Sequence, residues 1–367
     1  MHIPDGYLSP STCAVAYAAA VPFWYIALQR VKRLLNTRLV PLLAVFSAFS
    51  FVIMMFNLPL PGGTTGHAVG VGIAVVVLGP WAALLAISIA LLIQALFFGD
   101  GGITTLGANC FNMAIIGSLV AYGVYRLVAG RSAITSVQRV IAAALAGYVA
   151  INVAALLTAI EFGIQPTLFH DATGTPLYAP YPLYIAIPAM MIGHLSFAGF
   201  AELLITGGLM AYLQRTDPTL LQLTAPGVTG LAEETVQKIA AQGGWLSTRA
   251  LWGTVAVLMI LTPLGLLAAG TAWGEWGVED FTKPEMRQQI TAASGNQPPP
   301  AQVPQGLEQL ASLWTAPLPD YAPPFLRSPV LGYLLSAMVG IGLIILAFLL
   351  AGWLLDKIRG RTWTAAS

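Results

Sequence analysis

The sequence predicts an all-α integral membrane protein, in which a bundle of seven helices, one of them short, is followed by two further transmembrane helices. Of its 367 residues, 57% are hydrophobic and only 8% are charged, whereas soluble domains carry about 25% charged residues. The apolar residues also come in long runs, several of which reach the ~20 residues that cross a bilayer as a helix. The net charge of +1 gives no indication of a nucleic-acid partner.

The apolar runs define the expected spans in chain order. They are Thr12–Leu28, Val40–Leu58, Trp81–Phe98, Cys110–Val128, Val140–Phe162, Pro182–Leu213, Trp252–Trp273 and Val330–Leu355. A further helix, Ala68–Leu78, is too short to span, so we expect it to reach half depth and let the preceding glycine-rich loop dip into the protein. Pro182–Leu213 is longer than a bilayer is thick at about 1.5 Å per residue, and should tilt or kink near Pro188.

Basic residues give the expected orientation. One set of loops carries Arg30, Lys32, Arg33, Arg38, Arg126, Arg131, Arg139, Arg215, Lys238, Arg249, Lys357, Arg359 and Arg361. The opposite loops keep only Lys283, Arg287 and Arg327. The positive-inside rule therefore places the N-terminus outside and the C-terminus in the cytoplasm. The first span lacks the basic start of a cleaved signal peptide, since Asp5 precedes it.

Composition divides the chain into three parts. Residues 1–213 form the seven-helix unit, and residues 214–249 form a polar cytoplasmic linker in which Glu233, Glu234 and Lys238 follow an amphipathic pattern. Residues 250–367 form a two-helix module around a proline-rich extracytoplasmic loop, residues 274–327. We expect this loop to be extended and partly flexible, and its composition fits a spacer as well as a gate.

The first two residues and one distant histidine suggest a metal site. The terminal amine of Met1, the amide nitrogen of His2 and the Nδ1 of its imidazole can close two small fused chelate rings on one ion, and His67 can supply a fourth nitrogen. Four nitrogens in a plane favour Ni(II) or Cu(II) over tetrahedral zinc. The amide must lose its proton, so affinity should rise with pH. This chelate requires a free amine on Met1, and the alternative is an exposed terminal His2 with His67 as a helix cap.

Polar residues in the outward loops are candidates for orienting these ligands. Asp5, Thr65, Asp100, Thr104 and Asn109 are close in sequence to the proposed ligands or lie in loops on the same side. Such partners fix the orientation of metal-binding histidines. Capping of turns explains the same residues equally well.

Three further features have more than one interpretation. His194 and Glu202 form an ionisable pair within one span, for which we favour hydrogen bonding between helices over a proton relay. His170 lies in an outer loop, where it is solvated or serves as a capture site. Cys13 and Cys110 are expected to be buried small hydrophobes rather than a disulfide or ligands.

Motifs for hydrolysis are absent from the sequence. It contains no G-x-x-x-x-G-K-[ST] phosphate loop, no H-E-x-x-H pair and no G-x-S-x-G nucleophile turn. We therefore expect a protein that is not itself an enzyme and that receives any driving energy from elsewhere.

Several motifs resemble a known family. The opening Met1–Pro10 (MHIPDGYLSP), the segment Pro59–His67, the turn Leu78–Trp81 (LGPW) and the run Gln94–Asn112 resemble the CbiM/NikM family. These proteins are the substrate-binding S components of energy-coupling factor transporters for nickel and cobalt. The resemblance covers about Met1 to Leu213. The remainder, with the motifs WGEWG at residues 273–277 and PDY at residues 319–321, is similar to the small CbiN/NikN component, fused here to the first.

The resemblance implies a metal site and partners. It implies one ion bound through the Met1 amine, the amide and imidazole of His2, and the His67 imidazole. It also implies a transmembrane T component and ATP-binding cassette ATPase subunits as partners in a prokaryotic cytoplasmic membrane. The Ala14-x-x-x-Ala18 and Ala16-x-x-x-Ala20 spacings resemble the small-residue face that S components use against the T component.

The expected function is therefore Ni(II) capture for ATP-driven uptake. Co(II) is the close alternative because it lies just below nickel in the affinity series, while the fused second component is more typical of nickel members. A proton-coupled secondary transporter using His194 and Glu202 is the alternative from another class. An intramembrane metalloenzyme is disfavoured, since four nitrogen ligands leave no open position for chemistry.

Overall fold

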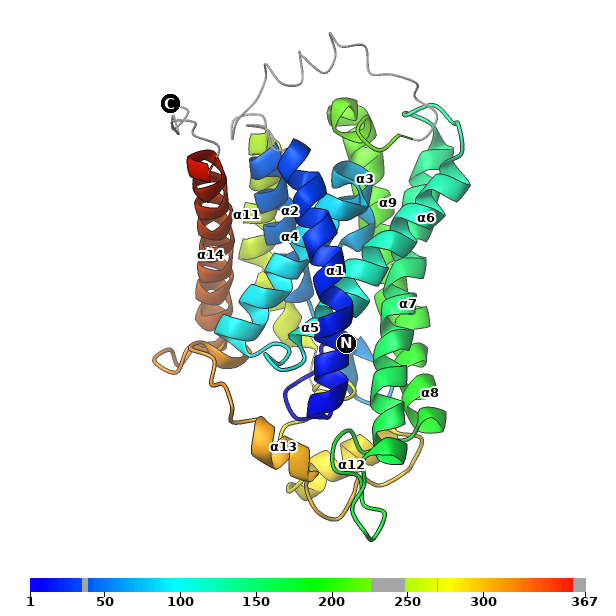
Figure 1. Ribbon diagram of the computed structural model, residues 1–367, viewed down its shortest axis with the longest axis vertical. Helices are drawn as coiled ribbons and strands as arrows, with labels where there is room; N and C mark the ends of the chain where they lie inside the picture. Colours follow the sequence, from blue (N-terminus) through cyan, green and yellow to red (C-terminus); the bar gives the residue numbers. More distant parts are fainter. Residues whose placement is uncertain (35–38, 226–247, 269, 359–367) are drawn as a thin grey trace.

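The computed structural model describes residues 1–34, 39–225, 248–268 and 270–358, and it is mostly helical (Figure 1). The elements are α1 (Pro10–Leu34), α2 (Leu39–Met54), β1 (Leu58–Leu60), β2 (Thr64–Gly66), α3 (Val71–Leu78), α4 (Pro80–Ile93), η1 (Gln94–Phe98), α5 (Leu106–Asn109), η2 (Cys110–Ile116), α6 (Gly117–Ala129), α7 (Val137–Leu168), α8 (Leu183–Gly193), η3 (His194–Ala198), α9 (Gly199–Thr216), η4 (Pro218–Leu221), α11 (Arg249–Leu261), η6 (Thr262–Leu267), α12 (Pro284–Ala293), α13 (Gln305–Leu310), η7 (Pro319–Tyr321) and α14 (Pro329–Ile358).

The protein is a multi-pass membrane protein. Within the described residues, 7 helical segments are long and apolar enough to cross a bilayer: Pro10–Lys32, Pro80–Phe98, Leu106–Ala129, Val137–Leu168, Leu183–Thr216, Arg249–Leu267 and Pro329–Leu354. They match expected spans. The expected span Val40–Leu58 is shorter in the structure, because α2 ends at Met54 and the chain then turns into the antiparallel hairpin of β1 and β2.

The short helix α3 lies inside the bundle, as the sequence predicts. All of its residues, Val71 to Leu78, are buried. It begins after Gly70, whose φ of 75° is a left-handed conformation that glycine adopts without strain, and ends at Gly79. Its N-terminus therefore lies inside the bundle, a few residues after His67.

Within the described residues, the π-helical segments η2 and η3 lie inside long helices, and η1 forms the end of the span that begins with α4. Such segments are frequent at functional sites. The helical pattern of α8 continues through Pro188, where we expected a tilt or kink, and the π-helical irregularity follows at His194–Ala198. There the Ser196 hydroxyl donates to the Ile192 carbonyl at 2.5 Å, a local bond that competes with the helical pattern.

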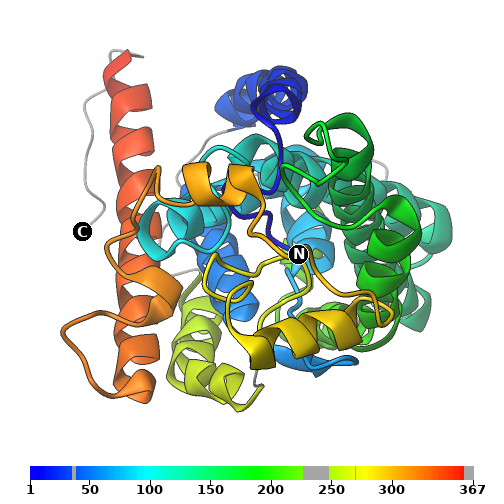
Figure 2. The same cartoon turned by 90° about the horizontal axis from the view of Figure 1, so that it is seen from below.

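The outer loop of the second module is folded, which corrects the expectation of an extended and flexible segment. It contains α12, α13 and η7, and it buries Trp276, Phe281, Ile290, Leu307 and Tyr321. Figure 2 shows α12 and α13 lying across one end of the bundle, with the N-terminus near the centre. The prolines make the loop irregular, but the aromatic and aliphatic residues between them supply enough apolar surface to pack it down.

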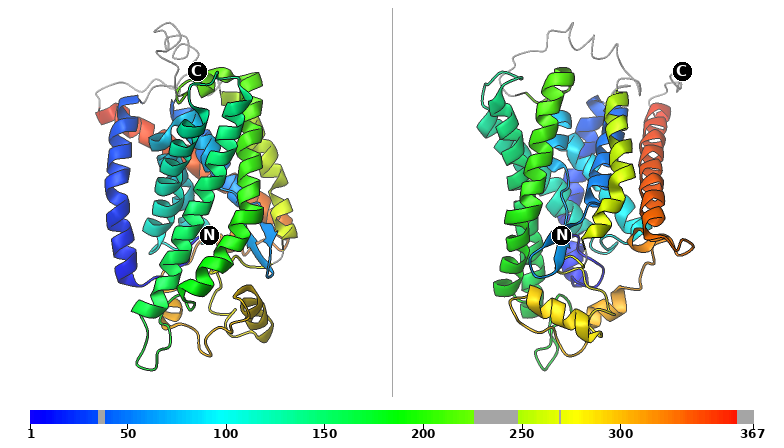
Figure 3. Two further views of the ribbon diagram at one scale, coloured as in Figure 1. Left: turned by 90° about the vertical axis from the view of Figure 1, so that its right-hand side faces the viewer. Right: turned by 180° about the vertical axis from the view of Figure 1, so that it is seen from behind.

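The two ends of the bundle differ in what they carry. Figures 1 and 3 place the N-terminus nearer the end that α12 and α13 cover, and the C-terminal ends of α9 and α14 at the opposite end.

Of the expected linker, residues 226–247 lie outside the described residues, and with them the amphipathic pattern of Glu233, Glu234 and Lys238. Arg38, Arg359 and Arg361 also lie outside them.

Candidate metal centre

The N-terminal segment is inserted into the protein. Met1 and His2 are each only 1% exposed, so the alternative of an ordinary exposed terminus is wrong. The backbone of Ile3 is held on both sides: its N–H donates to Asn109 Oδ1 at 2.8 Å, and its carbonyl accepts from Asn109 Nδ2 at 3.1 Å, Gly102 N at 2.9 Å and Thr105 Oγ1 at 2.5 Å. This clamp fixes the position of the two residues that precede it.

Asp5 ties the same segment to the loop before α5. Its carboxylate accepts from the backbone N–H of Thr104 at 2.7 Å and of Ile103 at 3.1 Å, and from the Thr104 hydroxyl. Gly102 lets the two loop segments approach each other, because a Cβ there would meet the Asp5 backbone nitrogen and carboxylate. Asp5 and Thr104 thus bind each other and hold the segment in place.

Glu202 fixes the loop that carries His67. Both carboxylate oxygens face the start of α3: Oε2 accepts from Val69 N and Gly70 N, each at 2.8 Å, and Oε1 accepts from Gly72 N at 3.2 Å. A carboxylate at a helix N-terminus satisfies donors that have no partner within the helix and interacts favourably with the helix dipole. The interpretation of Glu202 as a hydrogen-bonding anchor between helices is confirmed.

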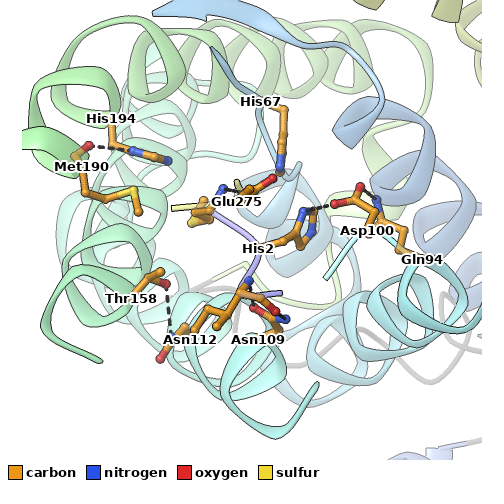
Figure 4. A network of polar contacts seen from close by, with 12 residues as sticks. His2, His67, Gln94, Asp100, Asn109, Asn112, Thr158, Met190, His194 and Glu275 are labelled. Carbon is orange, nitrogen blue, oxygen red and sulfur yellow. Dashed lines mark hydrogen bonds and ion pairs between the residues drawn. The ribbon is translucent and has the colours of Figure 1, made fainter. Parts of the chain in front are cut away.

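The two histidines meet at the centre of the bundle (Figure 4). Their rings stack with centroids 4.9 Å apart and an interplanar angle of 25°. Nδ1 of His67 lies 3.1 Å from the Ala68 carbonyl, while its Nε2 and both ring nitrogens of His2 are buried without a hydrogen-bond partner among the described residues. Burial, together with the nearby terminal ammonium and His2, holds the pKa of His67 well below its ordinary value, so this ring stays neutral and can ligate a metal.

Two carboxylates face the other nitrogen donors. The terminal nitrogen of Met1 lies 2.9 Å from Glu275 Oε1, and Nδ1 of His2 lies 2.6 Å from Asp100 Oδ1. The second contact has an ion-pair distance, so Nδ1 of His2 has a carboxylate as its direct neighbour. Burial alone would raise the pKa of Asp100, but the adjacent His2 reverses this effect and the pKa falls well below its usual range.

The second module also orients Asp100. Oδ2 of Asp100 accepts hydrogen bonds from the Tyr321 hydroxyl at 2.5 Å and from Gln94 Nε2 at 3.1 Å. Tyr321 stacks on Phe98 with centroids 4.9 Å apart, and it holds a left-handed backbone with φ of 59°. That conformation costs a non-glycine residue about 1–3 kcal/mol, which these contacts offset.

A cavity of about 320 Å³ adjoins the centre. Thr65, His67, Asp100, Glu275 and Asp320 contribute to its lining, and no lysine or arginine does so among the residues that the structure describes. Burial, then the neighbouring carboxylates of Asp100, Asp280 and Glu275, raise the pKa of Asp320. The cavity therefore favours a cation over an anion.

The remaining candidates lie apart from the centre or serve the fold. Nδ1 of His194 lies 2.8 Å from the Met190 carbonyl of its own helix. For His194, the predicted hydrogen bond between helices is therefore wrong. His170 is exposed, with Nδ1 3.0 Å from the Asp171 carbonyl. Cys13 and Cys110 are free and buried, as predicted.

Sequence reasoning brought Met1, His2 and His67 together and marked Asp100 and Asn109, but it did not assign Glu275 or Tyr321 to the site. The signal was present, because these two residues lie in the WGEWG and PDY motifs that mark the second module. The arrangement as a whole offers several buried nitrogen donors and two carboxylates to one divalent transition-metal ion.

Comparisons with known proteins agree with this chemistry. Residues 2–220 match the CbiM family, described as the cobalt uptake substrate-specific transmembrane region, and residues 247–357 match the PDGLE domain. The fused nickel transport protein NikMN of Rhodobacter capsulatus is 57% identical over 345 residues, which are 94% of this chain and 95% of that protein. The probable fused nickel transport protein LarMN of Lactiplantibacillus plantarum is 40% identical over 343 residues, 93% of this chain and 94% of that protein. A crystal structure of a transition metal transporter aligns with a TM-score of 0.56 at 55% identity, over 59% of this chain and 94% of that chain.

Proposed function

This chain belongs to the CbiM family, with a PDGLE domain fused to it, and we propose that it is the subunit that captures Ni(II) at the outer face of a prokaryotic cytoplasmic membrane for ATP-driven import. In this proposal the ion is bound by the Met1 amine, the deprotonated amide and Nδ1 of His2, and the imidazole of His67. The N-terminus faces outward and the C-terminus faces the cytoplasm, in line with the positive-inside rule.

One observation carries the proposal: the stacked rings of His2 and His67 are buried together with the terminal nitrogen, and Nε2 of each ring has no hydrogen-bond partner in the described part of the chain. A buried polar atom without a partner costs about 1–3 kcal/mol, so such atoms in a native site call for a ligand. A transition-metal ion bound by the terminal amine, Nδ1 of His2 and Nε2 of His67 would give that buried His67 nitrogen a partner.

The choice of Ni(II) over Co(II) rests on coordination chemistry. A planar set of four nitrogens with a deprotonated amide suits Ni(II), while Co(II) follows closely in the affinity series. The curated relatives that match almost the whole chain carry nickel in their names, which supports the same choice.

Energy for import is proposed to come from separate subunits, namely a transmembrane T component and ATPases of the ATP-binding cassette type. The first helix offers a surface for such a partner, since Ala14 and Ala18 are exposed along α1. Ala16 and Ala20 are buried against the chain's own helices, so only the first of the two small-residue spacings remains for docking. Nickel uptake that persists without any ATPase subunit would favour the secondary-transporter alternative.

The experiment that tests the ligand set is titration calorimetry with Ni(II) and Co(II) on detergent-purified protein. The native N-terminus is compared with a variant that carries one additional residue before Met1. The proposal predicts tight binding that is lost on extension, because the new peptide bond removes the terminal amine and pushes His2 from its position. Equal affinity in both proteins would contradict the amine chelate.

A further inference from the structure

The two carboxylates at the centre are not among the four nitrogen ligands, yet they face them. We propose that His2, Asp100 and Glu275 form a loading site, which holds an arriving divalent cation before the four nitrogens close on it. This inference rests on the proposed function and adds a step that precedes it.

The geometry of the loading site suits one ion. His2, Asp100 and Glu275 each offer a ligand atom, and these atoms all lie within 4.8 Å of one another. The side chains of Asp100 and Glu275 are 17% and 20% exposed, so both are reached from the cavity while His2 lies behind them.

An independent observation also points to a ligand at this place. His67 lines the same cavity, is 5% exposed, and leaves Nε2 without a hydrogen-bond partner in the described residues. A cation held by the carboxylates would thus already lie beside the nitrogens to which it moves next.

The chemistry of the ligands separates the two steps. Carboxylate oxygens and an imidazole can bind a partly hydrated divalent cation with the His2 amide still protonated. The nitrogen chelate forms more slowly, because each bond to the amine or the amide requires one proton to leave, and both protons go to solvent. A loading site keeps the cation in place while this exchange occurs.

The second module takes a direct part in this step. Glu275 belongs to the segment that follows α11, and Tyr321 from η7 holds Asp100 by a hydrogen bond of 2.5 Å. The negative charge of Asp100, Glu275 and Asp320 around the cavity raises the local concentration of cations. The fused module therefore contributes Glu275 directly to the loading site and positions Asp100 through Tyr321.

The test measures how fast Ni(II) binds. Stopped-flow absorbance follows formation of the nickel–amide chelate by the full chain, by Glu275→Gln and by the control Glu308→Gln, which removes an exposed glutamate of the same module that does not line the cavity. We expect Glu275→Gln to lower the association rate constant about tenfold at low ionic strength, with the difference shrinking as salt is added. Glu308→Gln should match the unaltered chain, and the final spectrum should keep its shape in all three.

Two results would overturn the inference. One is an association rate in Glu275→Gln equal to that of the control. The other is a faster dissociation with an unchanged association rate, which is what a carboxylate that merely anchors the terminal amine would give.

A second measurement uses only the unaltered chain, so it does not depend on whether a variant folds. Mn(II) prefers oxygen ligands and has the lowest affinity of the series for nitrogen sites. Millimolar Mn(II) should slow Ni(II) binding to the unaltered chain without displacing bound Ni(II), and an absence of slowing would refute the loading site. A chain that binds no Ni(II) at all would instead refute the proposed function on which the inference rests.

Discussion

Replacing Glu202 by glutamine should both destabilise the protein and weaken its metal site. The Glu202 carboxylate accepts from three backbone N–H groups at the start of α3, those of Val69, Gly70 and Gly72. Glutamine keeps one acceptor oxygen, loses the charge, and turns an NH₂ group toward a backbone donor. A hydrogen bond to a charged group contributes about 1.5–3 kcal/mol and a neutral one about 0.5–1.5 kcal/mol, while an unsatisfied buried donor costs about 1–3 kcal/mol.

The combined effect is a loss of about 3–5 kcal/mol in the free energy of unfolding. The Ni(II) affinity should fall as well, because the loop that Glu202 holds also carries His67. We expect an affinity at least tenfold weaker, which corresponds to about 1.4 kcal/mol of binding free energy. Thermal unfolding in detergent and titration calorimetry measure the two effects. The matched control is Glu161→Gln. This half-buried carboxylate accepts a bond from Asn112 Nδ2 at 2.7 Å and, among the described residues, none from a backbone N–H, so its replacement should cost less.

The anchoring role of Glu202 and the proton-relay hypothesis predict opposite outcomes. If Glu202→Gln keeps the melting temperature and the Ni(II) affinity of the unaltered chain but loses uptake, the anchoring role is refuted and proton transfer is favoured. A lower melting temperature together with weaker binding supports the anchor.

Three other predictions concern the N-terminal segment and His67. Asn109→Ala removes both side-chain bonds to Ile3 and should weaken Ni(II) binding about tenfold or more in calorimetry. The control is Asn152→Ala, whose side-chain amide donates to Tyr148 in its own helix, and which should leave the affinity near its original value. Equal affinities in the two variants would show that the clamp does not position His2. Ni(II) affinity should rise about tenfold or more per pH unit between pH 6 and 8, because the amine and amide release protons on binding while the lowered pKa of His67 keeps that ring neutral throughout. The same lowered pKa means that the unfolded chain takes up a proton at His67 before the folded chain does, so the metal-free protein should lose stability as the pH falls below about 6.5; a pH-independent affinity would contradict the amide chelate.

The parts of the site that sequence could predict are those set by covalent geometry. The proposed chelate of Met1 and His2 is visible in the first two residues, since its rings would close through bonds of the chain itself. The short helix α3 was predictable as well, because an apolar run too short to span lies between a glycine-rich loop and the Gly79-Pro80 turn.

Contacts across the fold could not be predicted from patterns. The Met1–Glu275 ion pair joins residues separated by 274 positions, and no periodicity connects them. The π-helical segments could not be predicted, because a π-helical stretch of five to seven residues hardly changes the apolar pattern of the sequence. The outer loop was misjudged because its prolines indicate irregular backbone, whereas burial of Trp276 and Tyr321 decides that it packs.

The most direct test of the central claim is nickel K-edge X-ray absorption on the Ni(II)-loaded full chain. We predict a four-coordinate planar ion with nitrogen neighbours only, since Asp100 and Glu275 have passed the ion to the amine, amide and imidazole donors. A six-coordinate ion with oxygen neighbours would contradict the account, because the carboxylates would then be the final ligands rather than the first ones.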